Sequence, residues 1–141
     1  MPQELSYFRL SLLSYLRDSH PYLANDNAFI TIRGDAAAEA YSVAVKNGQT
    51  HDQACEIANE VLYSGMLFSP YRTIVRNLWN EFEKDVTPVL AEEVAMELLP
   101  KLNGVFVKYH LTDDFDTTPE YDQLYTELTG AIQISLEDGI Q

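Results

Sequence analysis

Cysteine is almost absent from this chain, which carries one thiol, at Cys55. A single cysteine forms no intramolecular disulfide, so the fold must depend on a packed hydrophobic core. The acidic start, MPQEL, does not have the character of a signal peptide, and together with the single thiol it predicts a cytoplasmic protein. No apolar run approaches the roughly 18 residues that a transmembrane helix needs, so we expect no membrane association.

Basic residues are also scarce, with 9 Lys and Arg against 22 Asp and Glu and a net charge of −13. After Lys108 the chain has no Lys or Arg at all. An acidic surface repels nucleic acid and anionic membranes, so we expect a protein partner and no direct contact with either. Many soluble bacterial proteins are equally acidic, so the charge alone does not identify that partner. Eight acids lie in the base-free stretch: Asp113, Asp114, Asp116, Glu120, Asp122, Glu127, Glu137 and Asp138.

The motifs of common enzymes and metal sites are missing. The six glycines are scattered and form no phosphate-binding loop, and the three histidines form no metalloprotease motif. Asp18, Ser19 and His20 are the residue types of a hydrolytic triad, but adjacent residues cannot form the required relay. His51 and Cys55 supply two ligands, whereas a closed zinc site needs four. We therefore predict no catalytic residue, no cofactor and no metal.

What the chain does contain is helical periodicity. A composition of 46% hydrophobic and 22% charged residues is that of a globular protein, and 141 residues suit one domain over 1–141. The central element is expected at residues 69–82, where Ser69 caps a helix and Pro70 occupies its first position. We predict an all-α, compact single-domain bundle of about six or seven helices. The apolar stripe of the central helix comprises Tyr71, Ile74, Val75, Leu78, Trp79 and Phe82.

Two helices before this central element are expected to form an antiparallel hairpin. The first is capped by Asn25 or Asp26 and runs to about Lys46, and Gly48 follows as a left-handed helix stop. A capping box, THDQ, then opens the second helix at Thr50. Gly34 indicates either a kink or a tight helix crossing. The inward stripe of the first helix is predicted to contain Phe29, Ile32, Ala36, Ala40, Val43 and Ala44.

The remaining helices follow from similar signals. The first helix is expected from Glu4 to Arg17, before the DSHPY segment. Thr87–Pro88 and Thr118–Pro119 each combine a capping residue with a proline suited to the first helical position. Pro100 predicts either a kinked helix or a break between two abutting helices.

Two acidic segments are candidate sites. Asp52, Glu56 and Glu60 recur every four residues on one helix, with no Lys or Arg between Asn47 and Tyr71. They form either a solvated face or a docking stripe for a basic partner. The second segment is a loop, described by its three carboxylates: Asp113, Asp114 and Asp116. It lacks the ligand spacing, the glycine and the final glutamate of a calcium loop, so a solvated acidic loop is the alternative to a cation site.

Four long segments resemble one family. They are LSYFRLSLLSYLRDSHPYLANDNAFI, RGDAAAEAYSVAVKNGQTHDQACEIANEVLYSG, FSPYRTIVRNLWNEF and DDFDTTPEYDQLYTELTGAIQ. Together they are similar to the "domain of unknown function eighteen ninety-six" family over nearly the whole chain, from about Glu4 to about Leu136. The resemblance implies a small all-helical accessory protein encoded on conjugative transposons of anaerobic Gram-negative bacteria. It implies no activity and provides no catalytic residues.

Three functions are compatible with these observations. The first is a noncatalytic interaction protein of a mobile genetic element, which acts by helix-face docking. The second is an acidic DNA mimic that antagonises a DNA-binding protein, and it requires carboxylates at phosphate-like spacing on one surface. The third is a small-ligand binder or enzyme whose site is assembled from distant segments. Partner identity and homo-oligomerisation stay open.

Overall fold

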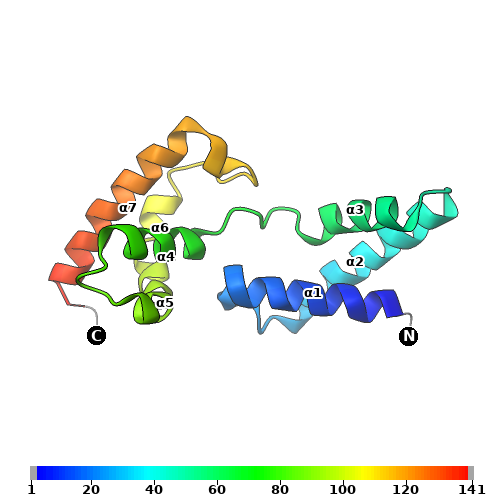
Figure 1. Ribbon diagram of the computed structural model, residues 1–141, viewed down its shortest axis with the longest axis horizontal. Coiled ribbons are helices and arrows are strands. Elements are labelled where there is room, and N and C mark those ends of the chain that lie inside the picture. Colours follow the sequence, from blue (N-terminus) through cyan, green and yellow to red (C-terminus); the bar gives the residue numbers. More distant parts are fainter. Residues whose placement is uncertain (1–2, 140–141) are drawn as a thin grey trace. The chain divides into compact units, whose positions relative to one another are not determined.

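The computed structural model describes residues 3–139, with side chains from Tyr7 onward, and this part of the chain contains helices and no strand (Figure 1). The all-α prediction is therefore confirmed, with seven α-helices in these residues. Short 3₁₀ turns lie at Pro21–Leu23, Pro88–Leu90 and Phe115–Thr117. The α-helices are α1 (Gln3–Ser19), α2 (Asn27–Lys46), α3 (His51–Leu62), α4 (Pro70–Glu81), α5 (Ala91–Lys101), α6 (Asn103–Phe106) and α7 (Pro119–Glu137).

The chain divides into two compact units, Met1–Met66 and Leu67–Gln141. Each unit has its own cluster of buried hydrophobic residues. The expectation of one core around residues 69–82 is thus wrong for the first unit, because chain length does not reveal how the apolar residues are partitioned. That residues 1–141 act as a single domain stays a prediction.

Unit 1, Met1–Met66, consists of α1, α2 and α3, with α2 packed against both of its neighbours. Small side chains make these contacts: Ala37 and Ala38 of α2 and Ala54 and Ala58 of α3 are all buried. Phe8, Leu12 and Leu16 of α1 fill the rest of this core. Because alanine is short, helices that meet through it approach closely.

The turn between α2 and α3 forms as predicted. Gly48 has a φ of +90°, a conformation that favours glycine, and it ends α2. The amide of Gln49 donates to the carbonyl of Ala44, 3.0 Å away. The capping box is complete, since the Thr50 hydroxyl accepts from the Gln53 amide and the Gln53 side chain accepts from the Thr50 amide. These contacts confirm the antiparallel hairpin around Gly48 (Figure 1).

Gly34 marks a tight crossing of α1 and α2. A Cβ atom at this position would lie 2.7 Å from Cγ and 3.3 Å from Cα of Arg9, so no side chain fits without displacing α1. Beside this crossing, the Arg9 guanidinium forms a salt bridge with Asp35, at 2.7 Å between Nη2 and Oδ1. The close approach of Arg9 confirms the predicted tight crossing, and α2 continues through Gly34.

The face of α2 that was predicted to be inward is half exposed, although Ala44 is buried and Phe29 packs against the core. Ile32 is 71% exposed and Val43 is 45% exposed. Two different apolar stripes of α2 have helical spacing, beside a polar stripe of Thr31, Asp35, Glu39, Ser42 and Lys46, and the contact with α1 decides which apolar stripe is buried. The buried residues are Ile30, Gly34, Ala37, Ala38 and Ala44.

Unit 2, Leu67–Gln141, is organised around α4, which packs against α5 and α7 (Figure 1). The Ser69 hydroxyl caps α4 by accepting from the Arg72 amide, 2.9 Å away. Large side chains fill this core, among them Ile74 and Leu78 of α4 and Leu128 of α7, all fully buried. The predicted central role of residues 69–82 therefore holds within this unit.

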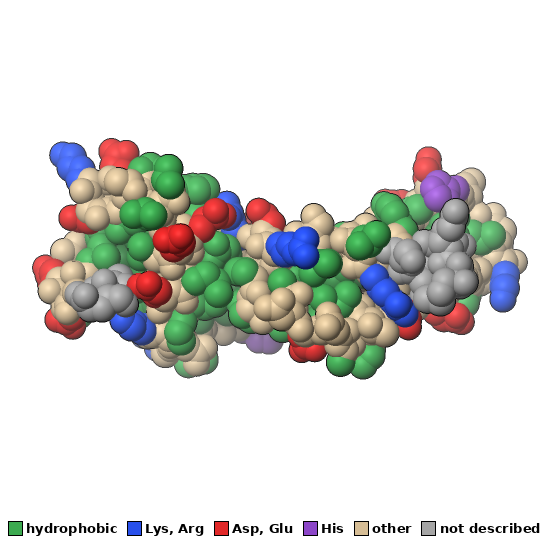
Figure 2. Space-filling model, turned by 90° about the horizontal axis from the view of Figure 1, so that it is seen from below, with side chains coloured by type: hydrophobic (Ala, Val, Ile, Leu, Met, Phe, Trp, Pro, Cys, Tyr) green, Lys and Arg blue, Asp and Glu red, His purple; other side chains and the backbone are tan. Residues whose placement is uncertain are grey.

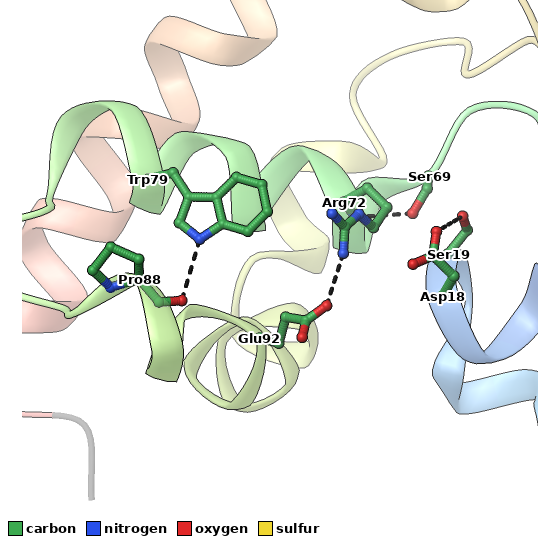
Figure 3. A network of polar contacts seen from close by, with 7 residues as sticks. All are labelled: Asp18, Ser19, Ser69, Arg72, Trp79, Pro88 and Glu92. Carbon is green, nitrogen blue, oxygen red and sulfur yellow. Dashed lines mark hydrogen bonds and ion pairs between the residues drawn. The ribbon is translucent and has the colours of Figure 1, made fainter.

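Trp79 differs from its predicted place in the core, since 40% of it is exposed. Its indole Nε1 donates to the carbonyl of Pro88, 3.3 Å away, and the guanidinium of Arg72 lies 5.4 Å from the ring centroid (Figure 3). Arg72 is held in turn by Glu92, at 2.9 Å. The core contacts of α4 are already made by neighbouring residues, so its widest side chain remains at the surface.

Pro100 stands one residue before the end of α5, and α6 begins at Asn103. Of the two predicted alternatives, the structure thus shows a break between two abutting helices. The amide of Leu102 still bonds to the carbonyl of Leu98, at 2.9 Å. Leu102 and Phe106 are both buried, which explains why the apolar rhythm continues across the break.

Candidate functional site

An uncovered apolar face of α2 is the most distinctive surface of unit 1. Ile32, Ala36, Ala40 and Val43 follow one another at intervals of four, four and three residues, which places them on one side of the helix. All are exposed except Ala40, which is half-buried. On α3, Ile57 is 38% exposed and lies beside the same seam. We call these five residues the hairpin strip.

The seam between α2 and α3 is hollowed in two places. One open groove of about 330 Å³ is lined mainly by apolar side chains, among them Ala40, Val43 and Ile57 of the hairpin strip. A second hollow, of about 410 Å³, is lined by Arg33, Glu60, Val61 and Ser64. These hollows are open to solvent along one side, so they suit an elongated partner better than an enclosed small molecule.

Arg33 holds the end of α3 in place. One of its guanidinium nitrogens lies 2.8 Å from the carbonyl of Ser64, 3.3 Å from that of Leu62 and 3.4 Å from that of Val61. The same guanidinium lies 5.1 Å from the centroid of the Phe29 ring. The Arg33 guanidinium beside the second hollow is therefore already hydrogen-bonded to carbonyls at the end of α3.

The predicted acidic stripe lies on the exposed side of α3. Glu60 lines the second hollow, Glu56 stands one helical turn before it, and Asp52 lies in the first turn. Successive i, i+4 positions drift by about 40° around a helix, so Asp52 is the farthest of the three from the seam. Asp52 also suits the positive end of the helix dipole. The structure thus places Glu60 at the seam between α2 and α3 and leaves Asp52 away from it.

Two of the three carboxylates in the predicted acidic loop accept hydrogen bonds that help to hold the loop in place. Asp113 Oδ1 accepts from the amide of Leu67, 3.1 Å away, and Asp114 Oδ1 accepts from the hydroxyl of Thr112, 2.7 Å away. Phe115 anchors the loop in the core, whereas Asp116 is exposed. Within the described residues, no three His, Cys, Asp or Glu side chains gather closely enough to hold a metal ion. The bonded acids of this loop therefore have a structural role.

His51 and Cys55 lie close together without forming a larger cluster. The Cys55 sulfur is 3.5 Å from His51 Nε2. On the other side of the ring, His51 Nδ1 is 2.8 Å from the hydroxyl of Tyr41. Tyr41 is the partner that sequence reasoning missed, because it comes from the preceding helix of the hairpin. These three side chains tie α3 to α2.

His20 has a structural place that the sequence did not predict. It is only 3% exposed, and its Nε2 lies 2.7 Å from the carbonyl of Met66, which also accepts from the Tyr15 hydroxyl at 2.6 Å. Its Nδ1 lies 3.0 Å from the Tyr22 hydroxyl. Burial lowers the pKa of His20, and the hydrogen bond to Met66 opposes this shift. A neutral ring that donates from Nε2 and accepts at Nδ1 satisfies both contacts.

In unit 2, Glu127 of α7 receives two donors that are remote in sequence. The ammonium of Lys108 and the hydroxyl of Tyr109 both bond to its carboxylate. These hydrogen bonds lower the pKa of Glu127, and the bond to the carboxylate raises the pKa of Tyr109. The contacts join the segment after α6 to α7.

Comparison with known proteins assigns the chain to a family. The model of the family described as domain of unknown function (DUF1896) matches residues 1–139. The chain belongs to this family. It is also similar to protein PG0816 from Porphyromonas gingivalis, whose crystal structure matches with a TM-score of 0.92 at 47% identity, covering 96% of this chain and 93% of that one. A search of curated proteins gives no match.

Among the described residues, every helix is too short or too polar to cross a bilayer.

Proposed function

We propose that this protein is a noncatalytic docking module, and that its hairpin strip receives a helix from a partner protein. The observation that carries this proposal is the exposure of the apolar face of α2, where Ile32 is 71% exposed. Large apolar side chains aligned on one helix face are a feature of interaction sites, whereas single exposed apolar residues are ordinary. The strip is aligned, and it continues across the seam to Ile57.

The dimensions of the strip suit a helix. From Ile32 to Val43 there are eleven steps of about 1.5 Å each, so the strip is about 16 Å long, or three helical turns. Ala36 and Ala40 occupy its middle, where short side chains permit close approach of another helix. Ile32 and Val43 at its ends provide apolar contacts for residues spaced at i, i+4 and i+7 on the partner.

The other two functions have less support. An enzyme or small-ligand site requires convergent polar groups in a concave pocket, whereas the groove beside Ala40 and Ile57 is open and mainly apolar. A DNA mimic requires a continuous row of carboxylates. On the face drawn in Figure 2, Asp and Glu side chains are interspersed with hydrophobic and uncharged ones. No specific observation therefore favours either alternative.

The biological setting is part of the proposal. The family resemblance supports an accessory protein of a conjugative transposon, and the single thiol supports a cytoplasmic location. A docking module fits that setting because an adaptor needs a stable fold and an accessible face, and it needs no catalytic group.

Site-specific photo-cross-linking in cells that naturally express the protein tests the proposal. A photoreactive amino acid replaces Val43 in the strip, and the matched control replaces Val107 of unit 2, which is 67% exposed. We expect a cross-linked protein from position 43 that is absent from position 107 and disappears when Ile32→Asp is added. The same products from both positions, or none from position 43, would contradict docking at the strip.

A further inference from the structure

We propose that the partner segment is an amphipathic helix rich in Lys and Arg, which binds with its apolar face on the hairpin strip. This inference rests on the proposed docking function and specifies the chemistry of the occupant. It follows from the charges along both edges of the strip and from the small side chains in its middle.

Carboxylates border the strip on both helices. On α2, Glu39 is exposed and stands three residues after Ala36 and four before Val43, so it lies on the adjacent edge. On α3, Glu60 stands three residues after Ile57 and lines the second hollow, with Glu56 one turn away. In the part of the chain that the structure describes, none of these three carboxylates forms a salt bridge. They are therefore available to cations of a partner.

Two cations lie near this border and offset part of its charge, since Arg33 lines the same hollow as Glu60. Arg33 already donates to three carbonyls at the end of α3. Lys46 lies three residues beyond Val43, in the last turn of α2. The three carboxylates outnumber these two cations, so a helix lying along the strip would meet an excess of negative charge, which favours Lys and Arg at its flanking positions.

A second copy of this chain is a poor occupant of the strip. Two α2 helices that packed antiparallel through Ala36 and Ala40 would bring Glu39 of each copy to the centre of the contact. Like charges at such close range disfavour the pairing, and the net charge of −13 on each copy adds to the repulsion. Nucleic acid and anionic membranes carry the same sign and are disfavoured for the same reason.

The shape of the strip defines the apolar side of the partner. The short side chains of Ala36 and Ala40 leave a shallow depression in the middle of the hairpin strip. A large side chain such as leucine is therefore expected at this point on the partner helix. Flanking Lys or Arg side chains then reach Glu39 on one edge and Glu56 or Glu60 on the other. Their long aliphatic stems add apolar contact while the charged ends meet the carboxylates.

Two designed helical peptides test the inference by isothermal titration calorimetry with the full chain. Both peptides have about four turns and the same leucine stripe, and they carry either Lys or Glu at the flanking positions. The strip variant is Glu39→Lys/Glu56→Lys/Glu60→Lys. The matched control, Glu83→Lys/Glu93→Lys/Glu97→Lys, makes the same change in net charge at exposed positions of unit 2.

We expect the Lys peptide to bind and the Glu peptide to bind at least about tenfold more weakly. The strip variant should lose at least about tenfold in affinity for the Lys peptide, and the control less than about threefold. Equal losses in the two variants would show a response to net charge alone and would overturn the inference. Equal binding of the two peptides, or no binding of the Lys peptide, would also overturn it.

The two proposals fail in different ways. If photo-cross-linking from position 43 captures a partner equally well with and without the three strip substitutions, the docking function stands and the basic helix is wrong. If position 43 captures nothing in the unsubstituted protein, the docking function itself is wrong.

Discussion

The two units of this protein bury different kinds of side chain. Among the described residues, alanine accounts for five of the eleven buried hydrophobic residues of unit 1, against two of the sixteen in unit 2. Unit 1 therefore brings its helices together through short side chains, whereas unit 2 fills the space between its helices with leucine, isoleucine and phenylalanine. Each buried large side chain contributes about 1.5–3 kcal/mol, so unit 2 has the larger hydrophobic stabilisation.

This difference in buried side chains affects where an interaction surface can arise. Both units expose some large hydrophobic residues, but in unit 2 these are spread over α4, α5, α7 and the connecting segments. In unit 1, Ile32 and Val43 share one face of α2, and Val43 lines a groove together with Ile57, while Tyr7, Leu10, Tyr22 and Val45 are exposed elsewhere. A helix that satisfies its packing through alanines on one face can carry its large apolar residues on the other.

The first prediction concerns the large-residue core of unit 2. Leu78 is fully buried, so Leu78→Ala should lower the free energy of unfolding by about 3 kcal/mol through lost burial and the cavity that remains. Urea unfolding followed by the fluorescence of Trp79, the single tryptophan, measures this change in the unit concerned. Leu90→Ala is the control, since Leu90 is 46% exposed and should cost less than about 1 kcal/mol. Similar losses for both variants would refute the assignment of Leu78 to the core.

The second prediction concerns the close packing of unit 1. Gly34→Ala should destabilise the protein by about 1–2 kcal/mol, because the new methyl group would meet Arg9 at 2.7 Å and outweigh the higher helix propensity of alanine. Gly130 is the matched control, because it lies within α7 with open space around its Cβ position. Gly130→Ala should stabilise the protein by up to about 1 kcal/mol. Thermal unfolding by circular dichroism compares the two, and a stabilising Gly34→Ala would disprove the tight crossing.

The third prediction tests whether Trp79 lies outside the core in which the sequence pattern placed it. Trp79→Ala should cost about 1–2 kcal/mol, since the variant loses the contact with Arg72 and the hydrogen bond to Pro88 but opens no internal cavity. A fully buried tryptophan would cost about 3–5 kcal/mol. Urea unfolding by circular dichroism measures the difference, and a loss in the higher range would return Trp79 to the core.

The fourth prediction is a pH dependence in unit 1. Burial holds the pKa of His20 below its usual value of 6.5, so the unfolded chain binds a proton more readily than the folded one. The contribution of neutral His20 is therefore complete above pH 6.5 and is lost as the pH falls from 6.5 through the lowered folded pKa. His20→Gln should flatten this part of the stability profile. Hydrogen exchange in α1 measures it, and identical profiles for the two proteins would exclude His20 as the cause.

The elements themselves were largely predictable from the chain. Ser69 with Pro70, the Thr50–Gln53 capping box and the Gly48 stop all form as expected, since each involves residues within a few positions of one another. The choice at Pro100 between a kink and a break was left open by the sequence. Packing of Leu102 and Phe106 into the core accompanies the break that the structure shows.

The candidate site was only partly predictable. Glu56 and Glu60 were recognised from their spacing, because that spacing places them on one side of a helix. The apolar strip that they border was assigned to the core, because Ile32 and Val43 have the same periodicity as buried residues. The sequence of α2 offers two apolar stripes at helical spacing, so the spacing alone did not determine which of them faces inward.

The caps at Ser69 and Thr50 and the stop at Gly48 were thus specified by the sequence alone, because their interactions act between near neighbours in the chain. Thr87 and Thr118, in contrast, form no side-chain cap, and α5 begins only at Ala91. The all-α class followed, since those signals recur along its length. Which face of α2 is buried, which unit receives each apolar residue and where Trp79 lies were decided only by the tertiary structure. These outcomes depend on which helices pack against each face. At Gly34, for example, the absence of a side chain allows α1 to approach one face of α2 closely.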